Sequence, residues 1–296
     1  MGTVKTNSME AWLLASRPKT LTGAAIPVMI GSALAYAYGH FQMTPAILCL
    51  LFAFLMQTDA NFINDLYDFK KGSDREDRLG PERACAQGWI TTRAMKAGIV
   101  VTTAIAGVIG MYLLNYGGWE MIPVGLACIV FAFLYTTGPY PLSYHGWGDV
   151  LVLVFFGFVS VGGTFYVMAH EWNPSVTMAS LASGLVIDTL LMINNFRDRE
   201  QDAASGKKTL VVRFGTRTGL ILYFLLGLFA CWCCFFFLSI GKVYATLLPQ
   251  IYLLFHILTT QKMAKIYKGK ELNRILGETS RNMFIFGLLL ALGLIL

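Results

Sequence analysis

Apolar residues in this chain come in long blocks that short polar segments separate. A soluble helix would show apolar positions repeating at the helical period, and a strand would alternate them. A helix of about 20 apolar residues crosses the hydrocarbon core of a bilayer. We therefore predict one membrane-embedded domain over residues 1–296, an all-α, multi-pass transmembrane bundle of about nine helices. The predicted spans are 20–37, 46–66, 95–114, 121–137, 149–169, 177–196, 218–239, 243–260 and 282–296.

The two ends of the chain carry the less regular parts of this pattern. The last predicted span, 282–296, is short, so eight spans are the alternative to nine. No small-residue cleavage site follows the first apolar run, which argues against a cleaved signal peptide. Residues 8–16 mix polar and apolar positions ahead of that run, and we expect a short amphipathic helix on the membrane surface.

Basic residues lie almost entirely on one side of the predicted bundle. With the N-terminus inside, 22 of the 23 Lys and Arg residues fall in inside segments, and only Lys242 falls outside. Basic residues flanking membrane spans favour the cytoplasmic face. The sequence therefore predicts a protein of the cell's inner (cytoplasmic) membrane with its N-terminus inside. The net charge of +6 reflects this topology and gives no reason to expect a nucleic-acid partner.

Two inside connections, 67–94 and 197–217, are long, polar and charged, and we expect them to form two cytoplasmic cap loops that carry the function. The six cysteines offer no competing site. Five lie inside predicted spans, and the Cys231-x-Cys233-Cys234 run has no second pair to complete a metal site. The four histidines are scattered, without metal-ligand spacing.

The first cap loop begins with a polar stripe at the inner end of the second span. Asn61, Asn64, Asp65 and Asp68 are spaced by three or four residues, so a helix would place them on one face. The second stripe has the same spacing at the inner end of the sixth span and contains Asn194, Asp198 and Asp202. A Gly-containing turn follows each stripe. This weak internal repeat predicts that both stripes face the same side of the membrane.

Acidic residues at a membrane-embedded helix end cost free energy and repel one another, so something positive must gather them. Oxygen ligands without Cys or His favour a hard cation, Mg²⁺ or Ca²⁺, and Mg²⁺ typically combines carboxylates with phosphate oxygens. Two such stripes beside many Lys and Arg residues indicate a diphosphate bound through magnesium. The alternative is that the acids and amides form ordinary interfacial ion pairs with the loop cations.

Both stripes belong to longer motifs. The first motif reads Asn64-Asp65-x-x-Asp68-x-x-x-Gly72-x-Asp74 and continues as Asp77-Arg78-x-Gly80-Pro81-x-Arg83. The second reads Asn194-Asn195-x-Arg197-Asp198-x-x-x-Asp202-x-x-x-Gly206-Lys207-x-Thr209-Leu210-x-x-Arg213-x-Gly215. Together they resemble the two motifs of the UbiA superfamily of membrane prenyltransferases. Further stretches resemble the branch of this superfamily that prenylates 1,4-dihydroxy-2-naphthoate: residues 17–20, 135–141 and 146–149. The first motif also continues as Gly80-Pro81-Glu82-Arg83, where other branches have an Arg-Thr-x-x-Arg-Pro-like element.

This resemblance implies a Mg²⁺-dependent enzyme that transfers a polyprenyl group from polyprenyl diphosphate to an aromatic acid, releasing CO₂ and giving demethylmenaquinone. We expect two Mg²⁺ ions, with Asn64, Asp68, Asn194 and Asp198 as catalytic residues. The expected metal ligands are Asn64, Asp68, Asp74, Asn194, Asp198 and Asp202. The expected diphosphate contacts are Lys71, Arg78, Arg83, Lys207 and Arg213. Tyr67, Tyr135 and Tyr144 are candidates to face the allylic cation, or else belong to an interfacial aromatic belt.

For the acceptor's carboxylate the candidates are Arg17, Lys19 and Arg197. Asp59 and Asp188 lie deeper than the motif carboxylates, and they either line the acceptor pocket or are protonated and hydrogen-bonded to Asn61 or Asn195. Three functional alternatives remain: a sister prenyltransferase with another acceptor, a secondary transporter and a non-catalytic scaffold. A transporter would place its acids near the membrane midplane on broken helices, which disagrees with their position here. The oligomeric state stays open.

Overall fold

The computed structural model describes residues 4–73 and 78–296, with the side chain of Lys19 left out. Every regular element in these residues is a helix. The elements are α1 (Met9–Ser16), α2 (Pro18–Ala37), α3 (Met43–Lys70), α4 (Thr92–Gly117), α5 (Met121–Thr136), η1 (Leu142–His145), α6 (Gly148–Val152), η2 (Leu153–Gly162), α7 (Gly163–Ala169), α8 (Pro174–Ala204), α9 (Leu210–Cys233), η3 (Cys234–Ile240), α10 (Val243–Leu247), η4 (Leu248–Gln250), α11 (Ile251–Ile266) and α12 (Leu272–Ile295). The all-α prediction is therefore confirmed.

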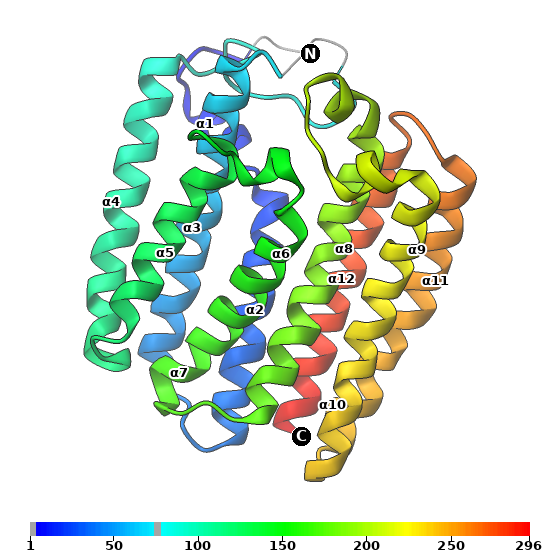
Figure 1. Cartoon of the computed structure of the whole chain (residues 1–296). Coiled ribbons are helices and arrows are strands. Elements are labelled where there is room, and N and C mark those ends of the chain that lie inside the picture. The colour runs from blue at the N-terminus through cyan, green and yellow to red at the C-terminus, as the bar shows by residue number, and fades with distance from the viewer. Residues whose placement is uncertain (1–3, 74–77) are drawn as a thin grey trace.

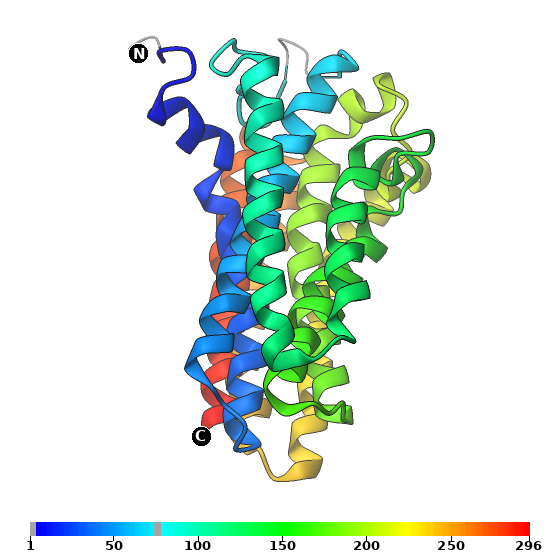
Figure 2. The same ribbon diagram turned by 90° about the vertical axis from the view of Figure 1, so that its left-hand side faces the viewer.

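Eight helical segments of the described chain are long and apolar enough to cross a membrane. The ninth predicted span is α5, an apolar helix of 16 residues that runs beside α3 and α4. The two termini lie at opposite ends of the bundle, which requires an odd number of crossings (Figures 1 and 2). The short span is thus α5, whereas the sequence placed it at the C-terminus, where α12 has 24 residues.

Several helix boundaries follow from capping residues. Asn173, Thr91 and Thr209 each accept a hydrogen bond from the backbone N–H three residues on, at 3.2, 3.2 and 3.3 Å, and so begin α8, α4 and α9. Gly72 and Gly206 follow the ends of α3 and α8 with φ of 69° and 78°, a conformation that favours glycine. These glycines stop both stripe-bearing helices at equivalent points.

The expected cap loops are shorter in the structure than in the sequence prediction. Helix α3 continues to Lys70 and α8 to Ala204, so both polar stripes are helical over their whole described length. The second loop is reduced to residues 205–209, because α9 begins at Leu210 and breaks at Gly215 (φ 86°). Loop residues 71–91 and 205–209 lie at the same end of the bundle (Figure 1).

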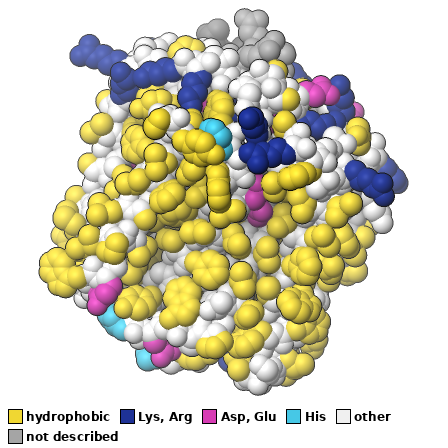
Figure 3. Space-filling view, in the orientation of Figure 1, with side chains coloured by type: hydrophobic (Ala, Val, Ile, Leu, Met, Phe, Trp, Pro, Cys, Tyr) yellow, Lys and Arg dark blue, Asp and Glu magenta, His cyan; other side chains and the backbone are white. Residues whose placement is uncertain are grey.

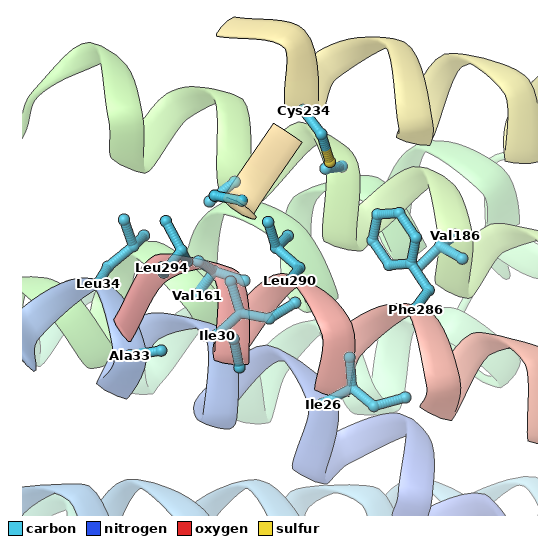
Figure 4. Packing of buried hydrophobic residues seen from close by; sticks show 14 of the residues in the cluster. Ile26, Ile30, Ala33, Leu34, Val161, Val186, Cys234, Phe286, Leu290 and Leu294 are labelled. Carbon is cyan, nitrogen blue, oxygen red and sulfur yellow. The ribbon is translucent and has the colours of Figure 1, made fainter. Parts of the chain in front are cut away.

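The main hydrophobic core lies where α2, α8 and α12 meet the π-helical segment η2. Ile26, Ile30 and Leu34 of α2 are fully buried and face Phe286, Leu290 and Leu294 of α12 (Figure 4). Val161 of η2 and Val186 of α8 close the cluster from the other side. This core holds α2, α8 and α12 rigidly beneath the end that carries the stripes.

Close helix contact depends on glycine where η2 crosses α8. A Cβ on Gly157 would lie 2.5 Å from the backbone oxygen of Ser180, and one on Gly184 would lie 3.0 Å from the backbone of Leu153. Backbone atoms cannot yield as a flexible side chain can, so the crossing must open if either glycine gains a side chain. A π-helical segment of ten residues is itself unusual, and such segments often accompany functional sites.

We predict that Gly157→Ala lowers the thermal midpoint of the detergent-solubilised protein, because overpacking a tight core costs about 1–3 kcal/mol. Gly277→Ala is the matched control, since a Cβ there meets nothing within 4 Å. Differential scanning fluorimetry of both variants measures the effect. Equal midpoints for the two variants would contradict the tight η2–α8 crossing.

Candidate functional site: two acidic helix ends joined by lysine and tyrosine

The first polar stripe divides into a structural half and a functional half. Asp65 is buried and accepts hydrogen bonds from the backbone N–H groups of Ala84 and Cys85, at 2.9 and 2.8 Å. Asn61 donates to the backbone oxygen of Ser16 and to the hydroxyl of Thr20. The expectation of one stripe facing one site is therefore wrong for Asp65 and Asn61, which fasten the first loop and the N-terminal segment to α3.

Asp68, on the other half of the stripe, is buried among three polar side chains. Its carboxylate lies 3.5 Å from the guanidinium of Arg83, 3.8 Å from the ammonium of Lys207 and 3.4 Å from the hydroxyl of Tyr144. Only 4% of Asp68 is exposed, so this charge depends on the cations around it. All three contacts are long, so Asp68 forms no short bond with these three side chains.

Lys207 connects the first stripe to the second. Its ammonium lies 3.8 Å from Asp68 of α3 and 3.9 Å from Asp202 of α8. The helical repeat thus does bring the two helix ends to one place, with a cation between their carboxylates. Ordinary interfacial ion pairs would not require acids from both motifs to share one lysine.

Tyr144 lies beneath two ammonium groups at this junction. Lys71 is 4.4 Å and Lys207 is 5.0 Å from the centre of its ring, both within the range of a cation–π interaction. Its hydroxyl is 2.7 Å from that of Ser73. Burial lowers the pKa of Lys71 from its usual value, while Asp68 acts to raise it and Lys207 to lower it further. Figure 3 shows Lys and Arg side chains gathered at this end of the molecule above an acidic side chain.

Asn64 lies where the polar site meets an apolar cavity. Its side-chain oxygen accepts a hydrogen bond from Thr136 at the end of α5, and the backbone oxygen of Thr136 accepts one from Lys71. The cavity has a volume of about 660 Å³. Asn64 and Tyr135 line it near the site, and Cys49 lines it towards the other end of α3. An apolar space therefore opens directly beside the acidic helix ends.

Part of the second stripe forms ion pairs and hydrogen bonds with other residues of the protein. Arg197 is buried and forms a bidentate ion pair with Asp198, at 2.7 and 2.6 Å. It also donates to Asn273, which donates to the backbone oxygen of Leu79 in the first loop. The structure therefore shows Asp198 in an ion pair with an arginine, as the alternative to magnesium binding predicts. Arg197, expected at the acceptor, is turned towards Asp198 and Asn273.

The remaining expected site residues are only partly brought together. Asn194 donates to the backbone oxygen of Leu190. Arg78 donates to Pro81, and Arg213 donates to the backbone oxygen of His145. Two further residues lie apart from the Asp68 junction. Tyr67 packs against the cluster around Phe62 and Leu66 with Lys70 over its ring, and Arg17 forms the junction of α1 and α2. Asp74 and the side chain of Lys19 lie outside the described residues.

The two deeper acids have different surroundings. Asp59 is fully buried and accepts a hydrogen bond from Thr103 of α4, at 2.8 Å. The expected bond to Asn61 is not formed, because Asn61 is turned towards α2. Asp188 is 5% exposed, and its Oδ1 has no hydrogen-bond partner among the described residues.

The donor set fits a hard divalent cation by its chemistry. Asn64, Asp68 and Asp202 offer oxygen atoms, and neither His nor Cys is among the motif residues. Among residues 4–73 and 78–296 no three acidic, His or Cys side chains stand close enough together to hold an ion. The carboxylates that converge do so around the ammonium of Lys207, so a cation from solution would join or displace a positive charge already present.

Sequence reasoning missed three residues that complete the site. Thr136 bonds both Asn64 and Lys71, Ser73 bonds Tyr144, and Asn273 joins Arg197 to the first loop. Thr136 follows Tyr135 in a stretch on which the family resemblance rests, and this position could have marked it as a site residue. Nothing in the sequence marks Asn273, because its role depends on α12 packing beside α8.

The chain forms a multi-pass helical bundle of a membrane protein, and one end of the bundle brings acids from two repeated motifs and a cluster of cations together beside an apolar cavity. The model of the UbiA prenyltransferase family matches residues 24–292. The chain belongs to this family.

Curated relatives narrow the comparison. The chain is 35% identical over 303 residues to 1,4-dihydroxy-2-naphthoate octaprenyltransferase of Haemophilus influenzae, covering 97% of this chain and 96% of that protein. It is 40% identical over 214 residues to the protein of the same name from Escherichia coli, covering 70% and 69%.

Solved structures share the fold. A UbiA homolog from Archaeoglobus fulgidus, described as bound to GPP and Mg²⁺, matches with a TM-score of 0.67 at 17% identity, covering 96% of this chain and 99% of that one. The apo structure of a UbiA homolog from Aeropyrum pernix K1 matches with a TM-score of 0.68 at 18% identity, covering 93% and 96%. At this identity the likeness establishes the fold.

The structure predicts different consequences for two neighbouring acids of the first stripe. Asp65→Ala leaves two buried backbone N–H groups without acceptors, each at a cost of about 1–3 kcal/mol, and we expect a clear fall in thermal midpoint. Asp68→Ala removes a carboxylate whose contacts with Arg83, Lys207 and Tyr144 are all long, and its midpoint should change much less. Fluorimetric melting of both variants in one detergent measures this. A larger loss for Asp68→Ala would contradict the division of the stripe.

Proposed function

We propose that this chain transfers a polyprenyl group from polyprenyl diphosphate to 1,4-dihydroxy-2-naphthoate with loss of CO₂, giving demethylmenaquinone. One observation carries the proposal: Asp68 and Asp202, from the two family motifs, lie within 4 Å of the same lysine beside an apolar cavity. The names of the curated relatives support the choice of acceptor. The rival within the family is another aromatic acceptor.

Lysine and arginine side chains hold the diphosphate in this proposal. Lys71 and Lys207 both lie over the ring of Tyr144, and Arg83 lies beside Asp68. As the bond to the prenyl group breaks, negative charge grows on the departing diphosphate, and cations already in position stabilise it without reorganising. Arg78 of the first loop and Arg213 of the first turn of α9 complete the set once the anion is bound.

In this proposal Asn64, Asp68, Asn194, Asp198 and Asp202 would hold two Mg²⁺ ions, with Asp74 from the segment outside the described residues, and the ions would neutralise charge on the diphosphate. For Asp198 to serve as a ligand, Arg197 must share or release its carboxylate. Lys207 then moves from the two acids towards the diphosphate oxygens. The resting ion pairs thus keep the acids compensated until the donor arrives.

The apolar cavity accommodates the prenyl chain. Along α3 it runs from Asn64 to Cys49, about 22 Å at 1.5 Å per residue. Tyr135, Phe155 and Phe156 line it. Aromatic faces near the site stabilise positive charge on the allylic carbon, and the apolar walls exclude water that would otherwise capture it.

The orientation in the membrane follows from charge. Because the basic residues gather at the end that carries Asp68, Lys207 and the N-terminus, we place this end in the cytoplasm and the bundle in the inner membrane. The diphosphate and the aromatic acid would then reach the site from the aqueous side.

We expect purified protein with radiolabelled polyprenyl diphosphate, Mg²⁺ and 1,4-dihydroxy-2-naphthoate to form demethylmenaquinone. Asp68→Asn and Asp198→Asn should each lower kcat/KM at least 100-fold, in line with the loss of one preorganised electrostatic partner. Asp59→Asn, which changes a buried acid bonded to Thr103, is the control and should retain most activity.

Two outcomes would contradict the proposal separately. Undiminished product in excess EDTA, or in the Asp68→Asn and Asp198→Asn variants, would contradict the metal assignment. Prenylation of 4-hydroxybenzoate but not of 1,4-dihydroxy-2-naphthoate would contradict the acceptor.

A further inference from the structure

The connection between α5 and α6 contacts both charged loops of the candidate site. We call its residues 138–146 the strap. The strap contains no Lys, Arg, Asp or Glu, although it lies among charged segments. Gly138 and Gly146 at its two ends have φ of 93° and 81°, a conformation that favours glycine. The strap is therefore a neutral segment with a defined backbone path between two helices.

The second loop is fixed to the strap through backbone atoms. The backbone N–H of Lys208 donates to the backbone oxygen of Tyr144 at 2.8 Å, and Arg213 donates to the next backbone oxygen of the strap at 2.7 Å. A Cβ on Gly146 would lie 2.6 Å from the backbone oxygen of Lys208, so no side chain fits between the two segments. Lys207, which lies within 4 Å of acids from both stripes, directly precedes this contact. The strap therefore fixes the path of the second loop beside that lysine.

The first loop is fixed to the same tyrosine through one side chain. The hydroxyl of Ser73 lies 2.7 Å from the hydroxyl of Tyr144. The backbone N–H of Ser73 donates to the backbone oxygen of Asp68 at 3.0 Å, which ties Ser73 to the last turns of α3. The Tyr144 hydroxyl also lies 3.4 Å from the Asp68 carboxylate. Ser73 therefore joins the strap to the helix end that carries the first stripe.

The ring of Tyr144 is the place where cations of both loops come together. The ammonium of Lys71 is 4.4 Å from the ring centre, and that of Lys207 is 5.0 Å from it. Two ammonium groups repel one another, whereas the negative face of an aromatic ring attracts each of them. The ring thus offsets part of this repulsion and keeps the two lysines close to one another. It can do so only where the bonds of the strap hold it.

We propose that the strap positions Lys71 and Lys207 for the diphosphate, and that Ser73 is a positioning residue that acts through Tyr144. This inference rests on the proposed function and adds to it the residues that order the two lysines. Lysine side chains lose rotamer freedom when they bind an anion, and those already held on a ring lose less of it. A diphosphate therefore binds more tightly to lysines that Tyr144 holds than to the same lysines free in solvent.

The test measures binding of inorganic pyrophosphate, which requires neither the prenyl chain nor the aromatic acceptor. We would determine its dissociation constant with Mg²⁺ by titration calorimetry, in which the stoichiometry reports the fraction of folded protein separately from the affinity. The variants are Ser73→Ala, Ser73→Thr, Tyr144→Phe, Tyr144→Leu and the double variant Ser73→Ala with Tyr144→Phe. Ser239→Ala is the matched control, because its hydroxyl donates to Phe236 within η3, which precedes α10 at the opposite end of the bundle (Figure 1).

We expect Ser73→Ala and Tyr144→Phe each to weaken pyrophosphate binding about five-fold, the effect of one lost hydrogen bond. The double variant should lie within about two-fold of Tyr144→Phe, because both changes remove the same bond. Tyr144→Leu also removes the ring and should weaken binding about 20-fold. Ser73→Thr keeps a hydroxyl and, like the control, should lie within about two-fold of the wild type.

Several results would overturn the strap alone, in a protein that does bind pyrophosphate with Mg²⁺. These are wild-type affinity in Ser73→Ala and Tyr144→Phe, losses that multiply in the double variant, or a Ser73→Thr variant as weak as Ser73→Ala. A Tyr144→Leu variant no weaker than Tyr144→Phe would overturn the part of the ring. A wild type that binds no pyrophosphate with Mg²⁺ would overturn the proposed function and this inference with it.

Discussion

The structure depends on holding carboxylates from two helix ends together at the edge of an apolar bundle. Asp68 and Asp202 are both largely buried, and like charges in such a place repel strongly unless cations lie between them. Lys207 supplies a positive charge that both acids share, and Lys71 and Lys207 both lie over the ring of Tyr144. Both loops supply cations to these acids: the first loop brings Arg83 back to Asp68, and the second brings Lys207 to Asp68 and Asp202. A bound diphosphate with divalent cations would hold these carboxylates and cations together more strongly.

The fastening of the loops explains why several motif acids and amides are not in the site. Asp65 fixes the backbone at Ala84 and Cys85, which places Arg83 next to Asp68. Asn273 of α12 plays the corresponding part between Arg197 and Leu79. Groups that fasten the loops thus alternate along one helix face with groups of the candidate site.

Much of the fold could be predicted from the sequence because membrane spans are long, apolar and flanked by charge. The stripes, their terminal glycines and the sharing of one end by both motifs also followed from helical spacing. The split between Asp65 and Asp68 could not be predicted, because both fall on the same face and only the return path of the loop separates them. The short α5, the π-helical η2 and the bond from Asn273 to Arg197 depend on packing between segments that are distant in sequence.

The central claim is that Asp68 and Asp202 belong to one site for magnesium and diphosphate. The most direct test is the Mg²⁺ dissociation constant in the presence of pyrophosphate for the wild type, Asp68→Asn, Asp202→Asn and the double variant. Groups that act together in one site are strongly non-additive. We expect each single substitution to weaken binding at least ten-fold and the double variant to be little weaker than either. Losses that multiply in the double variant would show two independent sites and contradict the account.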